Sequence, residues 1–139
     1  MKTVEASKGL KAALLADAAA CAAMAAVHLL AGGALADGLA LPRSQVLGVG
    51  VFLVPWSAFL LGLARWPWPT AEWMLGVVVG NGLWAIAAFG LLASDAFAAT
   101  AWGQAYLALH GLGVLLLATA VWLAWRHACA VSAGRVARA

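Results

Sequence analysis

Four residues capable of chemistry interrupt an otherwise apolar N-terminal stretch, from Lys11 to Leu35. They are Asp17, Cys21, Met24 and His28, which lie 0, 4, 7 and 11 positions along from the first of them. At about 100° per residue, these positions fall within an arc of about 60° and form one stripe about 16 Å long on a helix. An acid and an imidazole on a membrane helix cannot face lipid without cost, so we expect other helices to cover this N-terminal stripe.

Two kinds of metal chemistry fit the stripe when His110 of the last hydrophobic segment joins it. Thioether and imidazole groups suit soft or borderline ions such as copper, and Met24, His28 and His110 are the metal candidates. Cys21 is left out of this set because it lies about 10 Å from His28 along the helix axis. A haem held by both histidines would need them on diagonal helices, since neighbouring helices are only about 8–10 Å apart.

A pathway for protons or a polar ligand is the third use of these residues. Ionisable groups inside a membrane span are candidates for function, and histidine titrates near neutral pH. The candidate site residues are Asp17, Cys21, Met24, His28, Asn81, Trp84, Tyr106 and His110. In the structural alternative, cysteine and methionine only fill space, and Asp17 reaches interface water or pairs with Lys11 or Arg126. The two histidines then form satisfied buried hydrogen bonds, for instance to each other or to Asn81.

The composition of the whole chain indicates a membrane protein. Of its 139 residues, 66% are hydrophobic and 9% charged, whereas an average soluble domain is about 25% charged. The mean hydropathy is +0.99. Four segments have about the length needed to cross a bilayer: 12–35, 46–64, 73–93 and 104–125. Because the connections are short, we expect an all-α, antiparallel bundle of four transmembrane helices that forms a single domain, 1–139.

The basic residues predict how this bundle sits in the membrane. One side carries Lys2, Lys8, Lys11, Arg65, Arg126, Arg135 and Arg138, and the other side carries Arg43 alone. Basic residues gather on the cytoplasmic side, so both termini are expected in the cytoplasm of a bacterium, with the chain in its inner membrane. The net charge of +3 comes from these segment ends, and we see no footprint for nucleic acid.

The third segment contains a possible contact surface. Gly76 and Gly80 form a G-x-x-x-G pair, which lets a second helix approach closely, either within the monomer or in a homo-oligomer. Asn81 follows directly, and its amide needs a hydrogen-bond partner inside the membrane. It either ties this helix to a neighbour or faces a ligand.

Several short motifs together resemble a known group of proteins. They are Leu14-Leu15-Ala16-Asp17-Ala18, Leu41-Pro42, Val54-Pro55-Trp56, Asn81-Gly82-Leu83-Trp84 and Gly103-Gln104-Ala105-Tyr106. This pattern resembles that of small four-span bacterial inner-membrane proteins of unknown function. The resemblance implies a four-helix fold with Asp17, Asn81 and Trp84 at recurring positions, and it implies no activity. His110 stands where the group tends to have glutamine, and His28 is a further departure, so histidine chemistry would be particular to this chain.

The sequence contains none of the common catalytic patterns. It has no Ser/His/Asp set, paired carboxylates, phosphate-binding glycine loop or H-E-x-x-H motif. We therefore expect a small non-catalytic membrane protein that acts as an oligomer or as an accessory subunit of a membrane complex. The sequence itself requires no cofactor and leaves open whether one binds. The alternative is a binder or carrier of a small ligand, metal or proton in the outer-leaflet half of the bundle. It would use His28 and His110 with Asp17, Met24 and Asn81.

Overall fold

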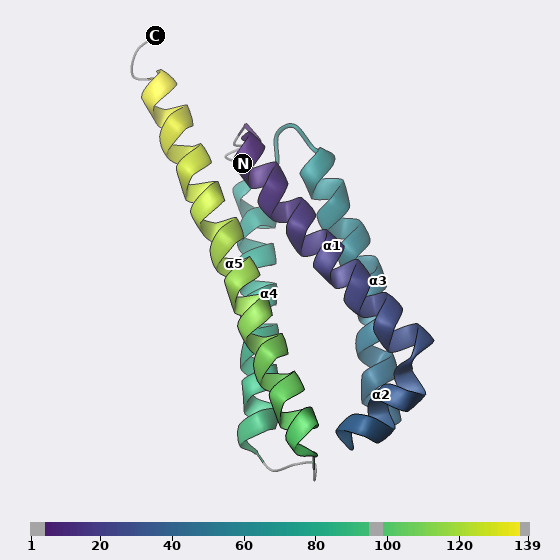
Figure 1. Cartoon of the computed structure of the whole chain (residues 1–139). Helices are drawn as coiled ribbons and strands as arrows, with labels where there is room; N and C mark the ends of the chain where they lie inside the picture. The colour runs from purple at the N-terminus through teal and green to yellow at the C-terminus, as the bar shows by residue number, and fades with distance from the viewer. Residues whose placement is uncertain (1–4, 95–98, 137–139) are drawn as a thin grey trace.

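The computed structural model is an all-helical bundle and describes residues 5–94 and 99–136 (Figure 1). Its helices are α1 (Lys8–Leu30), α2 (Gly32–Leu39), α3 (Arg43–Arg65), α4 (Ala71–Ala93) and α5 (Ala101–Val136). All except α2 are long and apolar enough to cross a membrane. The four-helix fold predicted from hydropathy is therefore confirmed, and the chain is a multi-pass integral membrane protein.

The first span was expected to end at residue 35, and this was wrong. Helix α1 stops at Leu30, Ala31 leaves the helical conformation with φ −117°, and a separate short helix, α2, follows. Two consecutive glycines begin α2, and glycine is a poor helix former. The break also lets the chain pack tightly on α3, because a Cβ added to Gly32 would lie 2.8 Å from the Leu47 side chain. Part of the expected loop between the first two spans is thus helical.

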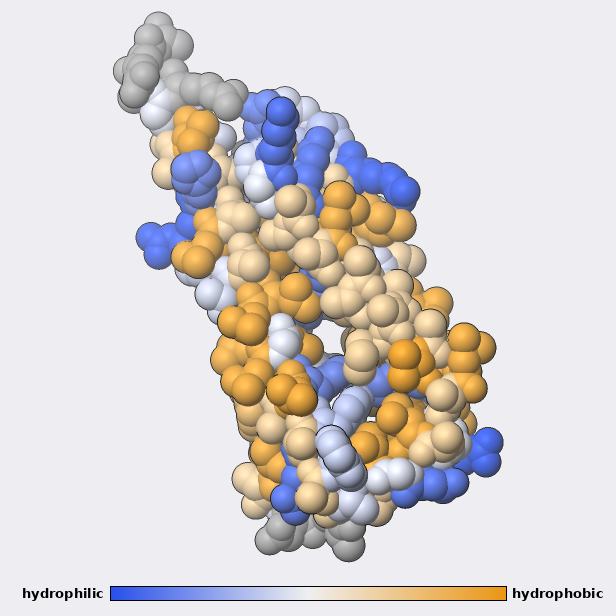
Figure 2. All heavy atoms as spheres, viewed as in Figure 1, coloured by the Kyte–Doolittle hydropathy of each residue, from blue (hydrophilic) through white to orange (hydrophobic). Residues whose placement is uncertain are grey.

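Helix α5 continues beyond the expected span, which ended at 125. With 36 residues, it is about 54 Å long, whereas the hydrocarbon core is about 30 Å thick. Its C-terminal part extends past the start of α1 in Figure 1. Hydrophilic residues gather towards the two ends of the bundle, and hydrophobic residues cover most of its length (Figure 2). Ile86, Leu109 and Leu116 are 68%, 70% and 71% exposed, which fits lipid-facing positions.

The basic residues separate between the two ends of the bundle. Those at the end where α1 begins are Lys8, Lys11, Arg65 and Arg126, and Arg43 begins α3 at the opposite end. Arg135 lies in the last turn of α5, and Lys2 and Arg138 lie outside the described residues.

The long helices form two pairs that are joined at both ends of the bundle. Helix α1 packs on α3, and α4 packs on α5 (Figure 1). At the end where α1 begins, the pairs share a core of buried side chains from all four helices, including Leu10, Leu14, Leu60, Met74, Val77 and Val121. The region between the two joined ends is where a site can form.

At the opposite end, Thr100 joins α2 to the start of α5. Its backbone N–H donates to the Leu39 carbonyl at 3.2 Å, and its hydroxyl donates to the Gly38 carbonyl at 3.1 Å. The same hydroxyl accepts from the Gly103 N–H at 3.1 Å. Gly103 also lies against the Leu39 carbonyl so closely that a side chain has no room there.

Candidate functional site

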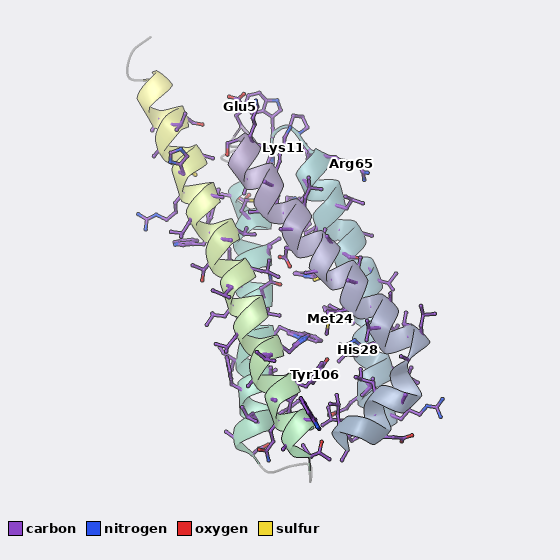
Figure 3. All side chains as sticks on the ribbon, viewed as in Figure 1. Glu5, Lys11, Met24, His28, Arg65 and Tyr106 are labelled. Atoms are coloured by element: carbon purple, nitrogen blue, oxygen red, sulfur yellow. The ribbon has the colours of Figure 1, made fainter. Side chains whose placement is uncertain are left out.

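The N-terminal stripe faces the interior of the bundle. Asp17 and His28 are each only 1% exposed, and Cys21 and Met24 are half-buried. Figure 3 shows Met24 and His28 directed towards the space between the helix pairs, with Tyr106 approaching from α5. Lys11 lies away from them, near the end where α1 begins. The four residues therefore belong to one interior surface of α1.

A central cavity of about 380 Å³ lies between the helix pairs, and side chains of all four long helices line it. The predicted site residues that line it are Asp17, Cys21, Met24, Asn81, Trp84, Tyr106 and His110. His28 borders a smaller neighbouring cavity of about 190 Å³, which shares Trp84, Tyr106 and His110 with the first. Figure 2 shows an opening between α1 and α5 with hydrophilic atoms at its edge. The predicted residues thus come together in space.

The first polar link across the cavity joins α1 to α4. The Asn81 amide donates to Asp17 Oδ2 at 2.6 Å, and the Cys21 thiol donates to Asp17 Oδ1 at 3.6 Å. Asn81 is only 4% exposed, so this hydrogen bond lies away from water. Asp17 is therefore held by an amide and a thiol, and the alternative in which it pairs with Lys11 or Arg126 was wrong.

The second polar link joins α1 to α5. His28 Nδ1 lies 2.7 Å from the Met24 carbonyl oxygen, and His28 Nε2 lies 2.7 Å from the Tyr106 hydroxyl. A carbonyl oxygen only accepts, so Nδ1 carries the proton, and the neutral ring accepts the Tyr106 proton at Nε2. Both ring nitrogens of His28 are occupied in this way.

The third polar link lies within the second helix pair. Trp84 Nε1 donates to His110 Nε2 at 2.7 Å. An accepting Nε2 carries no proton, so the proton of neutral His110 is on Nδ1. His110 lines the cavity, and this N–H has no hydrogen-bond partner among the described residues.

The hydrogen bonds expected of the two histidines are present, but their side-chain partners are Tyr106 and Trp84, not the other histidine or Asn81. His28 and His110 are instead bridged by Tyr106, whose ring centroid lies 6.0 Å from that of His28 and 5.7 Å from that of His110. The tyrosine thus separates the two imidazoles while holding one of them by a hydrogen bond.

An aromatic wall, formed by Phe52, Trp56 and Trp84, lines the cavity on the side of α3 and α4. The Phe52 and Trp84 rings stack with centroids 5.2 Å apart and an angle of 8°, and Trp56 stacks on Phe52 at 6.0 Å and 20°. Of these, Phe52 and Trp56 were missing from the predicted site. Their spacing of four residues on a helix was the available signal, because it places both rings on one face.

Of the candidate metal ligands, His28 is engaged through both ring nitrogens and His110 through Nε2. Residues 5–94 and 99–136 contain no cluster of three or more His, Cys, Asp and Glu side chains that could hold a metal ion. A metal at Met24, His28 and His110 would have to displace the Tyr106 hydroxyl or the Met24 carbonyl from His28. The same holds for a haem between the histidines. The donors present suit hydrogen bonding better than metal coordination.

The two glycines of the G-x-x-x-G pair have different surroundings, and this yields a prediction. A Cβ on Gly80 would lie 2.9 Å from the Trp56 ring, whereas nothing lies within 4 Å of one on Gly76. We expect Gly80→Ala to destabilise the protein by about 1–2 kcal/mol, because the rigid indole must move. Gly76→Ala should be neutral or slightly stabilising. Thermal unfolding in detergent measures both effects.

Size-exclusion chromatography with light scattering supplies the control for these variants. A change of oligomeric size in Gly76→Ala alone would assign the open glycine to a contact between copies. Equal stability of the two variants would contradict the close packing of Gly80 on Trp56.

Comparison of the sequence with protein-family models, with curated proteins and with solved structures finds no match. The motif resemblance to small four-span proteins therefore stays a prediction. The function has to be argued from the cavity and its hydrogen bonds.

Proposed function

We propose that this protein is a non-catalytic, membrane-embedded binding protein for a small and mostly apolar molecule. The observation that carries the proposal is the central cavity of about 380 Å³, lined by four helices. Small-molecule sites commonly measure about 300–1,000 Å³ and combine apolar walls with a few polar groups. This cavity has that size and that composition, and two buried polar residues, Asp17 and Asn81, line it.

The arrangement of the helices supports a cavity that persists without a ligand. Protein interiors are normally packed with few voids larger than a water molecule. Here the two helix pairs are joined by a core at one end and by the Thr100 hydrogen bonds at the other. Between these ends, the Asp17–Asn81 and His28–Tyr106 bonds cross from one pair to the other. A ligand would therefore meet a site that is already formed, which lowers the entropic cost of binding.

Two side chains provide free hydrogen-bonding capacity for the ligand. His110 Nδ1–H is a donor without a partner among the described residues, and Asn81 keeps its carbonyl oxygen as an acceptor, since its amide nitrogen serves Asp17. The opening between α1 and α5 gives a route from the lipid (Figure 2).

We also propose the inner membrane of a bacterium as the location, with both termini in the cytoplasm, as the motif resemblance and the basic residues suggest. Lys8, Lys11, Arg65 and Arg126 at one end outnumber Arg43 at the other. In this orientation, His28 and His110 lie in the outer half of the bundle. Such a binding protein can act alone, as a homo-oligomer or as an accessory subunit of a larger membrane complex.

The test fills the cavity at Gly113, which lines it and has no atom within 4 Å of an added Cβ. In nanodiscs, tert-butylbenzene should shift the indole NMR resonances of Trp56 and Trp84 in the wild type. Gly113→Leu should abolish these shifts and raise the free energy of unfolding by about 1 kcal/mol, because leucine favours the helix and occupies empty space.

Gly134→Leu is the matched control, since Gly134 is on the same helix, outside the cavity, and also has open surroundings. It should leave the shifts unchanged. Absence of shifts in the wild type, or equal shifts in Gly113→Leu, would contradict the proposed function.

A further inference from the structure

Asp17 has surroundings that are unusual for a carboxylate inside a membrane. It is 1% exposed, and its hydrogen-bond donors are the Asn81 amide and the Cys21 thiol. The residues that line the cavity include no lysine, no arginine and no second acid. Ionisable side chains within a membrane usually pair with one another or mark the path of a substrate or ion. Asp17 has no lysine or arginine partner there, so its carboxyl group is available to a cationic ligand.

The aromatic wall adds a second attraction for positive charge. The faces of aromatic rings carry negative charge density, and tryptophan attracts cations most strongly. Phe52, Trp56 and Trp84 line the same cavity as Asp17. Trp56 lies against Gly80, and the next residue, Asn81, donates a hydrogen bond to Asp17. The aromatic wall therefore starts close to Asp17. Carboxylate and rings therefore act on the same small volume.

The remaining lining decides between a metal ion and an organic cation. Hard metal ions need about six oxygen ligands, whereas the side chains close to Asp17 offer few oxygens. Much of the other lining is aliphatic, with Leu53, Leu109, Val114 and Leu117 among its members. Such a surface suits a bulky apolar group. The site thus combines one negative charge, three aromatic rings and apolar volume.

We propose that the ligand of the central cavity is a monovalent organic cation, an ammonium group attached to an apolar body. Its charge lies beside Asp17 and the aromatic wall, and its apolar part occupies the space between α1 and α5. This inference rests on the proposed function, because it specifies the class of ligand for the same cavity.

The experiment compares two probes of nearly the same shape that differ in charge. Phenyltrimethylammonium carries a positive nitrogen where tert-butylbenzene has a neutral carbon. Both are titrated into the full-length protein in nanodiscs, with binding followed through the indole resonances of Trp56 and Trp84. Each probe concentration is expressed as the concentration in the bilayer. The different partitioning of the two probes into lipid then does not affect the comparison of their affinities. We expect the cation to bind at least about tenfold more tightly than the neutral probe.

Asp17→Asn removes the charge and keeps the size of the side chain, so it should abolish the preference for the cation. Asp17→Glu keeps the carboxyl group and should retain most of the preference for the cation. Asp37→Asn makes the same change at an exposed position outside the cavity and should leave the preference unchanged. If Asp17→Asn fails to fold, Trp56→Leu tests the same inference. Loss of the indole ring should weaken binding of the cation more than binding of the neutral probe.

The outcomes separate this inference from the proposed function. Equal binding of the two probes, or a preference that survives in Asp17→Asn, would overturn the proposal of an organic cation as ligand. It would leave the proposal of a binding protein standing. Binding of neither probe would overturn both proposals. Tight cation binding that depends on Asp17 supports both.

Discussion

Replacing Asn81 with leucine is expected to lower the free energy of unfolding by about 2–3 kcal/mol, since hydrogen bonds to charged groups contribute about that much. Leucine has the same number and branching of side-chain heavy atoms as asparagine, so the main change is the loss of the polar groups. The change removes the 2.6 Å hydrogen bond to Asp17, which joins the two helix pairs. Asp17 then keeps only the Cys21 thiol as a donor while remaining buried. Reversible unfolding in mixed micelles, followed by circular dichroism, measures the loss.

Two further variants show whether the loss comes from this hydrogen bond. The exchange Asp17→Asn with Asn81→Asp restores one carboxylate and one amide, so it should recover at least half of the stability that Asn81→Asp alone loses. Gln104→Leu also replaces an amide by leucine, but at an exposed position, and should cost less than about 0.5 kcal/mol. If Asn81→Leu costs no more than this control, the hydrogen bond does not hold the pairs together.

Hydropathy predicts the four long helices well, because a backbone inside lipid must satisfy its own hydrogen bonds and a helix does so within one segment. The break at Ala31 was harder to predict. The stretch from 12 to 35 has no proline and no polar residue at Ala31, and its two glycines are compatible with a continuous helix. The break depends on the contact between Gly32 and Leu47, which exists only once α3 has packed against the chain.

The periodicity of a helix also predicts much of the site. It places Asp17, Cys21, Met24 and His28 on one face, and the structure turns that face inward. It does not predict the partners, because those depend on the rotation and separation of distant helices. Asp17 and Asn81 are 64 residues apart in sequence, and His28 and Tyr106 are 78 apart. Each histidine therefore forms a hydrogen bond with an aromatic side chain, whereas a histidine or an asparagine had been given as the example of a partner.

The aromatic wall shows a different limit of sequence reasoning. Tryptophan and phenylalanine in a membrane helix are equally compatible with a lipid-facing position, an interface or a cavity wall. Phe52 is 46% exposed and yet lines the cavity, so neither its type nor its position in the span identified it. The four-residue spacing of Phe52 and Trp56 places both rings on one face, and the stacking of Phe52 on Trp84 of a different helix shows that this face lines the cavity.

His28→Ala should have the largest effect on stability, a loss of about 3 kcal/mol. The side chain is 1% exposed, so its removal leaves a void, which in protein cores costs about 2–5 kcal/mol for a large side chain. It also deprives the Tyr106 hydroxyl of its acceptor. His110→Ala should cost less, about 1 kcal/mol, because His110 is only half-buried and the loss falls mainly on its bond with Trp84. Chemical unfolding of the purified variants in mixed micelles measures both.

His127→Ala is the matched control, since His127 is exposed on α5, and its effect should stay within about 0.5 kcal/mol. A double-mutant cycle with Tyr106→Phe isolates the hydrogen bond from the void, and we expect a coupling of about 1 kcal/mol. Because the His28–Tyr106 bond holds α1 to α5 beside the cavity, His28→Ala should also weaken probe binding. Lower stability with unchanged binding would mean that His28 supports the bundle but does not shape the cavity.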